Sequence, residues 1–233
     1  MYHPFSVTET LSIAWHIFKK NFATVAVYSL VAVALLFGVG ILVKFVLIDV
    51  VLAGIGTLFS LILFSFIFLA FIKLVFQLID KEYYDFEIRD IMPSFKMLLS
   101  YLILLVIVST TYVFIFAGIQ RLDDGIIQQL LGIFSKFIVE IFFLFYFPIC
   151  SCFIVDDSSG PFESLGQSLQ LIKGNFLKYV LLFIIIEIMV LAAAFTIIGM
   201  VFVVPFVNIT LVVAYRKLVY SHMDVDDDIT ETV

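Results

Sequence analysis

Six long apolar runs alternate with short polar segments along the chain. Their approximate bounds are 22–43, 51–79, 98–119, 128–154, 177–198 and 200–217. A helix rises 1.5 Å per residue, so about 20 apolar residues cross a hydrocarbon core of about 30 Å. The runs are continuously apolar, whereas barrel strands alternate in polarity and are only about 10 residues long. We therefore predict an all-α, polytopic membrane protein with six transmembrane helices.

A second pattern precedes each pair of runs, namely a short segment with one apolar stripe. Lys19, Lys96 and Lys173 recur at a spacing of 77 residues, and each closes such a segment. The apolar positions before each lysine are separated by four and then three residues, so they share one helical face. These positions are Leu11, Trp15 and Phe18, then Ile88, Met92 and Phe95, then Leu165, Leu169 and Ile172. Such segments predict three amphipathic helices that lie flat at the headgroup level.

This recurrence predicts a three-fold internal repeat, because a fixed period of self-similarity is typical of repeated units. The units cover about residues 5–79, 82–154 and 159–217, within one transmembrane domain over residues 1–220. The middle unit departs most from the pattern, since it carries Pro93 inside its connector. Residues 221–233 are acidic and contain no basic residue, so we expect a disordered tail.

Helix starts are marked before the first and third amphipathic segments. Ser6 and Glu9 have the spacing of a capping box. Gly160 is placed as an N-cap, with Pro161 at the first helical position and Glu163 in the first turn. We expect helices to begin at these points.

Composition excludes a soluble globular domain. Hydrophobic residues make up 64 % of the 233 residues and charged residues 14 %, with a mean hydropathy of +1.21. Soluble domains are about 45–50 % apolar and about a quarter charged. A soluble fold of this chain would expose large apolar patches.

The basic residues predict how the chain is oriented. With six spans, both termini lie on one side, and nine basic residues fall there against two on the other side. The nine are Lys19, Lys20, Lys81, Arg89, Lys96, Lys173, Lys178, Arg216 and Lys217, and the two are Lys44 and Arg121. This bias predicts a multi-pass protein of the inner (cytoplasmic) membrane with cytoplasmic termini and cytoplasmic amphipathic helices. Anionic lipid would then attract the interfacial lysines by about 1 kcal/mol each. We expect these lipid contacts at Lys19, Lys20, Lys96, Lys173 and Lys178.

Residues 161–176 read Pro-Phe-Glu-Ser-Leu-Gly-Gln-Ser-Leu-Gln-Leu-Ile-Lys-Gly-Asn-Phe, and two spans follow, with Pro205 and Tyr215 in the second. This stretch resembles a broad group of bacterial membrane proteins of unknown function. The group includes the membrane domain attached to some glycerophosphodiester phosphodiesterases. The resemblance is best over residues 148–217 and implies no catalytic residue, because the chain has no room for the soluble catalytic domain.

Glu187 is the most informative polar residue within the spans. It lies near the middle of the fifth run, where an ionisable group costs several kcal/mol unless it is paired, solvated or protonated. Other polar side chains at the middle of their runs are Asn208, Thr210, Ser109, Thr110 and Thr111. Together they form either a small polar site, such as a proton or cation relay, or interhelical hydrogen bonds worth about 0.6 kcal/mol each.

Two lysines lie within the spans and have different candidate partners. Lys73 either pairs with Glu187 or extends its amine to the headgroups. Lys136 and Glu140 are four residues apart, and we expect them to pair on one helix face.

Small residues and thiols add little chemistry. Glycines toward the far ends of the spans, among them Gly38, Gly40, Gly54, Gly118 and Gly132, predict close helix approach there. Cys150 and Cys152 would point about 200° apart on a helix, which argues against a metal site. No phosphate loop, dinucleotide pattern or zinc motif is present, so we expect no cofactor and no metal. No basic and aromatic surface indicates nucleic acid.

These patterns predict a non-enzymatic membrane protein that acts as an accessory, lipid-organising or transport-related component. Its expected partners are membrane lipids, together with a protein partner or a second copy of the chain. The alternative is a small transporter or channel with a polar site around Glu187. A third interpretation, an enzyme acting on lipids within the membrane, is disfavoured by the shortage of paired acids, bases and metal ligands.

Overall fold

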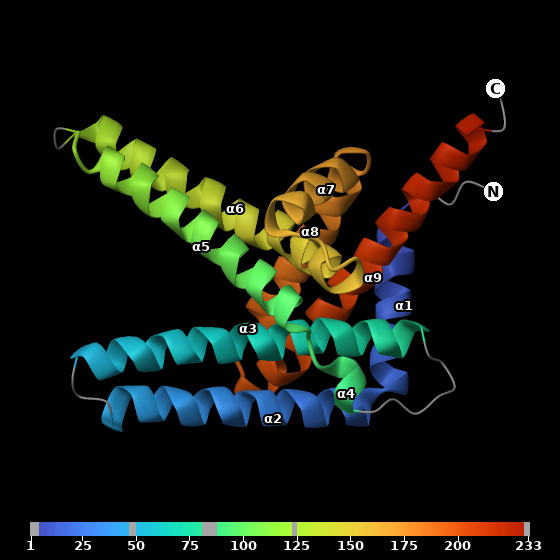
Figure 1. Ribbon diagram of the computed structural model, residues 1–233. Helices are drawn as coiled ribbons and strands as arrows, with labels where there is room; N and C mark the ends of the chain where they lie inside the picture. Colours follow the sequence, from blue (N-terminus) through green and yellow to red (C-terminus); the bar gives the residue numbers. More distant parts are fainter. Residues whose placement is uncertain (1–4, 47–49, 81–87, 123–124, 231–233) are drawn as a thin grey trace.

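The computed structural model describes residues 5–46, 50–80, 88–122 and 125–230, and these residues form helices with no strand among them (Figure 1). The helices are α1 (Val7–Lys20), α2 (Phe22–Ile41), α3 (Val50–Asp80), α4 (Ile88–Ile91), α5 (Phe95–Ile119), α6 (Ile126–Asp156), α7 (Pro161–Lys173), α8 (Phe176–Ala193) and α9 (Ile197–Thr230). A π-helical turn, Leu42–Val46, extends α2. The all-α prediction is confirmed.

Within the described part of the chain, six helical segments are long and apolar enough to cross a membrane, the pattern of a multi-pass membrane protein. They are Phe22–Lys44, Val51–Asp80, Arg89–Ile119, Ile126–Asp156, Phe176–Ala193 and Val201–Tyr220. They form three hairpins, α2–α3, α5–α6 and α8–α9. The hairpins differ in length, since α3 and α6 have 31 residues each and α8 has only 18.

The first two hairpins diverge. In Figure 1 the α2–α3 and α5–α6 pairs meet near the middle of the molecule, and the far ends of these helices lie well apart on the left. Burial follows this arrangement, because the buried residues gather in the second half of α3, the last turns of α6 and the middle of α9. We call this buried region the junction and define it by Leu69–Leu78, Phe147–Val155 and Phe206–Leu218.

The second helix of each hairpin forms the centre of the molecule. Helices α3, α6 and α9 contact one another in all three pairings. Among the described residues of α2, by contrast, only Val25 is buried, and α5 buries residues only near its start, from Met97 to Leu104. Lipid is as apolar as these exposed side chains, so helices at the edge of the bundle need no further protein cover.

Helices α1 and α7 pack on the centre with small residues in their buried stripes. Helix α1 lies along α9, and α7 lies along α6. The buried stripe of α1 includes Thr10 and Ala14, and the equivalent positions of α7, at twice the 77-residue spacing, are Ser164 and Ser168. Small side chains let the backbones approach closely. In Figure 1 α1 lies across the direction of α2 and α3.

The apolar stripe that we predicted for these helices is displaced. Trp15 is 49 % exposed and its counterpart Leu169 is 47 % exposed, so neither belongs to the buried face. The small residues are buried together with Phe18 and Ile172, the last members of the predicted stripes, whereas the middle members Trp15 and Leu169 lie at the edge. The spacing of the apolar positions predicted the helical period of α1 and α7 correctly. It predicted the centre of their buried face wrongly.

The middle amphipathic helix is short within the described residues. Helix α4 has four residues and ends just before Pro93, which cannot continue the hydrogen-bond ladder. Helix α5 then begins with Ser94 as its N-cap, whose side chain accepts a hydrogen bond from the Met97 N–H at 3.3 Å. Most of the segment expected to form this helix, residues 81–87, lies outside the described residues, and the three-fold repeat stays a prediction.

Helix starts were predicted correctly at α7 and in part at α1. Gly160 is the N-cap of α7, and its N–H donates to Glu163 Oε2 at 3.3 Å. Ser6 is the N-cap of α1, but the expected capping box does not form. The Glu9 carboxylate instead pairs with Lys217 of α9.

One further expectation is corrected. Nothing lies within 4 Å of a Cβ built at Gly38, Gly40, Gly54, Gly118 or Gly132. Close helix approach at these five glycines is wrong, whereas at Gly199, another glycine near the far end of a span, a Cβ would lie 2.9 Å from the Ala193 carbonyl oxygen of α8. Helix α9 continues to Thr230, and disorder of the tail over residues 221–233 stays a prediction.

Candidate functional site

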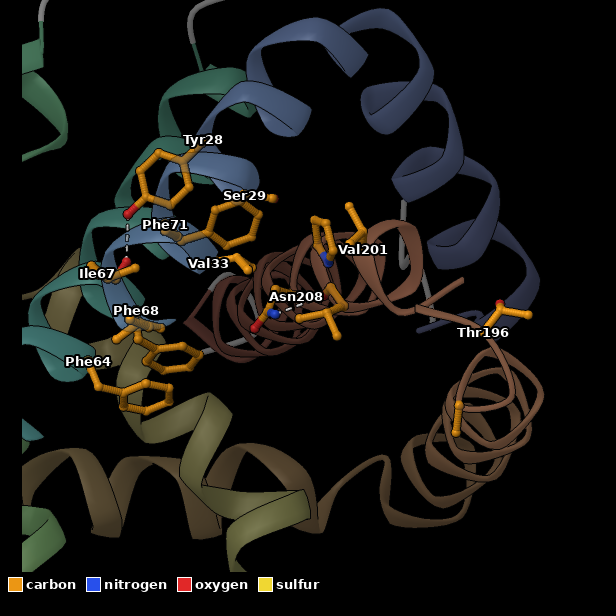
Figure 2. Close-up of a pocket in the computed structure, with 15 residues that line it drawn as sticks. Tyr28, Ser29, Val33, Phe64, Ile67, Phe68, Phe71, Thr196, Val201 and Asn208 are labelled. Atoms are coloured by element: carbon orange, nitrogen blue, oxygen red, sulfur yellow. Dashed lines mark hydrogen bonds between the residues drawn. The ribbon is translucent and has the colours of Figure 1, made fainter. Parts of the chain in front are cut away.

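A cavity of about 470 Å³ lies between α2, α3 and α9 (Figure 2). Its walls include Tyr28 and Ala32 of α2, Phe64 and Phe68 of α3, and Asn208 of α9. The volume falls in the range of about 300–1,000 Å³ that is usual for ligand pockets. None of its lining residues is an Asp, Glu, Lys, Arg or His. The cavity therefore suits an apolar group.

Three of the four polar side chains in the lining donate a hydrogen bond within the protein. The Tyr28 hydroxyl donates to the Ile67 carbonyl at 2.7 Å, which ties α2 to α3. The Ser29 hydroxyl donates to the Val25 carbonyl at 2.8 Å, and the Asn208 amide donates to the Val204 carbonyl at 2.9 Å. Figure 2 shows two of these bonds, at Tyr28 and Asn208. An occupant therefore meets mostly aliphatic and aromatic surface.

The depth of the cavity can be read along α2. At 1.5 Å per residue, Tyr28 lies about 9 Å and Leu36 about 21 Å from the start of the helix at Phe22. A hydrocarbon core is about 30 Å thick. The α2 wall of the cavity therefore lies around the middle of the core, from about 6 Å before its midplane to about 6 Å beyond it.

The predicted polar residues do not gather at one site. Asn208 lines the cavity, whereas Thr210 is fully buried and donates to the Phe206 carbonyl at 2.9 Å. Ser109, Thr110 and Thr111 are exposed on α5 and do not line this cavity. Thr111 donates to the Ile107 carbonyl of its own helix. The structure thus brings only Asn208 to the cavity.

Glu187 and Lys73 also lie apart from the cavity lining. Glu187 is half-buried on α8, and no hydrogen bond or ion pair to its carboxylate is found within the described part of the chain. Of the two alternatives for Lys73, pairing with Glu187 is not found among the described residues, because the Lys73 amine donates to the Met92 carbonyl at 2.8 Å. The break before Pro93 leaves this carbonyl accessible to the amine.

The Lys136–Glu140 pair is confirmed. The Lys136 Nζ lies 3.7 Å from Glu140 Oε1 on α6, and both side chains are more than half exposed. An exposed pair of this kind in water contributes little to stability. It therefore fits the structural role expected of it and adds no chemistry to the cavity.

An ion-pair network that sequence analysis missed joins the three central helices. The Arg216 guanidinium of α9 lies 2.7 Å from Asp80 Oδ2 of α3 and 3.5 Å from Asp156 Oδ1 of α6. It also stacks over Phe76, with the guanidinium carbon 4.7 Å from the ring centroid. The Tyr215 hydroxyl donates to Asp156 Oδ2 at 3.0 Å. One side chain thus ties together the ends of α3 and α6.

A signal for this network was present in the sequence. Asp80 and Asp156 are each the last residue of the second helix of their hairpin. An acid recurring at equivalent helix ends predicts a shared basic partner. Sequence analysis used Arg216 only as a basic residue for orientation.

An acidic cluster lies beside this network, at the α6–α7 connection. Burial raises the pKa of Asp157 above its ordinary value of 3.8, and the negative charges of Asp156 and Glu163 raise this pKa further. The positive charge of Arg216 offsets part of the shift. Among the described residues, no group of three or more His, Cys, Asp or Glu side chains is placed to hold a metal ion.

No family model matches the chain, and neither a curated protein nor a solved structure matches it. The resemblance noted for residues 148–217 therefore stays a prediction. What the geometry offers is an uncharged cavity between two hairpins, at a depth occupied by lipid chains.

Proposed function

We propose that the protein is a non-enzymatic, lipid-organising component of the inner membrane that holds an acyl chain of a membrane lipid between α2, α3 and α9. The observation that carries the proposal is the cavity of about 470 Å³ whose lining has no charged side chain. An apolar cavity does not hold water well, because water there finds too few polar partners. The acyl chains of the bilayer are the apolar groups available to fill it.

The distribution of basic residues supports cytoplasmic termini. Of the nine basic residues assigned to that side, Lys81 lies outside the described residues. Lys19, Lys96 and Lys173 are exposed near the starts of the three hairpins. Under this orientation the end of the cavity nearer Tyr28 lies in the cytoplasmic leaflet.

The first prediction concerns Ala32→Trp, which places a large ring in the cavity lining. A photoactivatable phospholipid with its reactive group at mid-chain is added to the purified protein in nanodiscs. Crosslinking to the peptides of α2, α3 and α9 is measured by mass spectrometry. We expect at least a several-fold loss of crosslinking at the cavity residues, because the indole occupies the space of the chain.

Ala34→Trp is the matched control. Ala34 lies on the same helix two residues away, is exposed and does not line the cavity. This variant should crosslink like the unmodified protein. If cavity peptides are not labelled in the unmodified protein, or if both tryptophans reduce labelling equally, the proposal of an acyl-chain site is wrong.

One observation favours a second candidate, transport of a proton or cation. Glu187 is half-buried in a span, and its carboxylate has no partner among the described residues. A carboxyl group in such a place marks a transport path by default. Glu187→Gln keeps the shape and removes the charge, so it should abolish any proton or potassium flux into liposomes at unchanged thermal stability. Absence of flux in the unmodified protein would reject this candidate.

A further inference from the structure

The end of α1 stands at the edge of the cavity. Phe22, just after α1, stacks on Phe202 of α9 with ring centroids 5.6 Å apart. Trp15 of α1 meets Phe206 edge-on at 5.8 Å. The next residues back along α9 are Val201 and Pro205, and both line the cavity. The last turns of α1 therefore cover the neighbouring face of the helix that forms one cavity wall.

A cation and an indole lie together at this edge. The Lys19 Nζ lies 5.5 Å from the ring centroid of Trp15, and the Lys19 side chain is exposed. Lys19 has no acidic partner among the described residues. The basic residues of α9 differ, since Lys217 is paired with Glu9 and Arg216 with Asp80. Lys19 thus keeps its positive charge available to a ligand. It lies beside an indole, a group that is enriched at the headgroup level of membranes.

Resting on the proposed function, we infer that the lipid in the cavity is an anionic phospholipid whose phosphate is bound by Lys19 beside Trp15. Lys19 lies shortly before Phe22, the first residue of α2. Measured along α2 from Phe22, the cavity begins at about 9 Å and ends at about 21 Å. One leaflet contributes about half of the 30 Å hydrocarbon core. A chain that starts from a phosphate at Lys19 therefore enters the end of the cavity nearer Tyr28 within its own leaflet, and the phosphate and the chain are placed as parts of one lipid molecule.

Charge makes this site selective. A zwitterionic headgroup brings its own ammonium group beside its phosphate, whereas an anionic headgroup does not. The attraction of one lysine to anionic lipid is about 1 kcal/mol, which corresponds to about a fivefold preference. Trp15 stabilises the position of the amine by a cation–π contact.

The test compares two photoactivatable lipids with identical chains, phosphatidylglycerol and phosphatidylcholine, in nanodiscs of matched composition. We expect phosphatidylglycerol to label the cavity peptides about five times more than phosphatidylcholine does. Lys19→Gln should bring the ratio close to one while labelling by phosphatidylcholine persists. Lys19→Arg, which keeps the charge, should retain most of the preference.

Lys96→Gln is the control, because Lys96 is the exposed lysine at the equivalent repeat position of α5. It should leave the ratio unchanged. Equal labelling by both lipids in the unmodified protein would overturn the inference and leave the acyl-chain site standing. An equal effect of both glutamine substitutions would also overturn it, since the preference would then come from general surface charge. No cavity labelling by either lipid would overturn the proposed function itself.

Discussion

Polar side chains within the spans bond mostly to their own helices. Four of these side chains donate a hydrogen bond to the backbone carbonyl four residues earlier in the same helix, at 2.8 or 2.9 Å. The donors are Ser29, Thr111, Asn208 and Thr210. In hydrocarbon every donor needs a partner, and this carbonyl is the nearest acceptor. Polar residues at a similar depth in different helices therefore do not by themselves form a polar pathway.

Asp157 shows how a single charge at the α6–α7 connection affects stability. Its pKa is raised by burial and by the charges of Asp156 and Glu163. A raised pKa means that the folded state favours the protonated carboxyl, so the resulting stabilisation is complete below 3.8 and is lost as the pH rises through the raised value. We expect Asp157→Asn to raise the melting temperature in detergent modestly at pH 7.

The pH series supplies the control for this prediction. Below the ordinary pKa, Asp157 is protonated in the folded and unfolded states alike, so the variant and the unmodified protein should melt together there. A lower melting temperature of Asp157→Asn at pH 7 would contradict the prediction. It would show that the carboxylate makes favourable contacts that outweigh its repulsion from the neighbouring acids.

At the scale of elements, the sequence predicts which helices exist better than it predicts their contacts. The spans follow from run length, and α1 and α7 follow from their 3.6-residue period. Which side of α1 is buried depends on the shape of α9, where Thr10 and Ala14 allow a closer approach than Trp15 does. That choice involves two helices distant in sequence, and the pattern of one helix does not contain it.

The cavity is a property of hairpin arrangement. Tyr28 and Phe68 look in sequence like any residues of an apolar run. They line a cavity because α9 packs against both α2 and α3, and the residues Ala194 and Thr196 of the α8–α9 connection also lie in the cavity wall. Helix lengths were predicted from the sequence, but the direction of each hairpin was not. The same limit explains why Asn208 was predicted as a site residue and its apolar neighbours were not.

At the scale of the whole molecule, the hairpins are held together mainly at the junction. Diverging hairpins share few contacts near their turns, and the exposed apolar surface there gains nothing in lipid from association. Arg216 bridges α3 and α6 from α9, and α3 and α9 also form two walls of the cavity. The geometry of the cavity therefore depends on this network.

Arg216→Met should destabilise the protein by about 1.5–3 kcal/mol, because it removes hydrogen bonds between charged groups and leaves Asp156 without its cation. The stability of Arg216→Lys should lie between that of the unmodified protein and that of Arg216→Met. An ammonium group keeps the charge but lacks the planar fork that reaches both Asp80 and Asp156. Lys217→Met is the matched control. Lys217 pairs with Glu9 and ties α1 to α9, so its loss should cost less. Denaturation in mixed micelles measures all three.

Arg216→Met also tests whether Arg216 only stabilises its surroundings or also sets the directions of the hairpins. Spin labels at Leu58 of α3 and Val113 of α5, both exposed, report the separation of the first two hairpins. If the network sets their directions, Arg216→Met should broaden the distance distribution and reduce lipid labelling of the cavity together, and Lys217→Met should change neither. Lower stability with an unchanged distribution would limit Arg216 to local stabilisation. The packed residues of the junction would then set the directions of the hairpins without it.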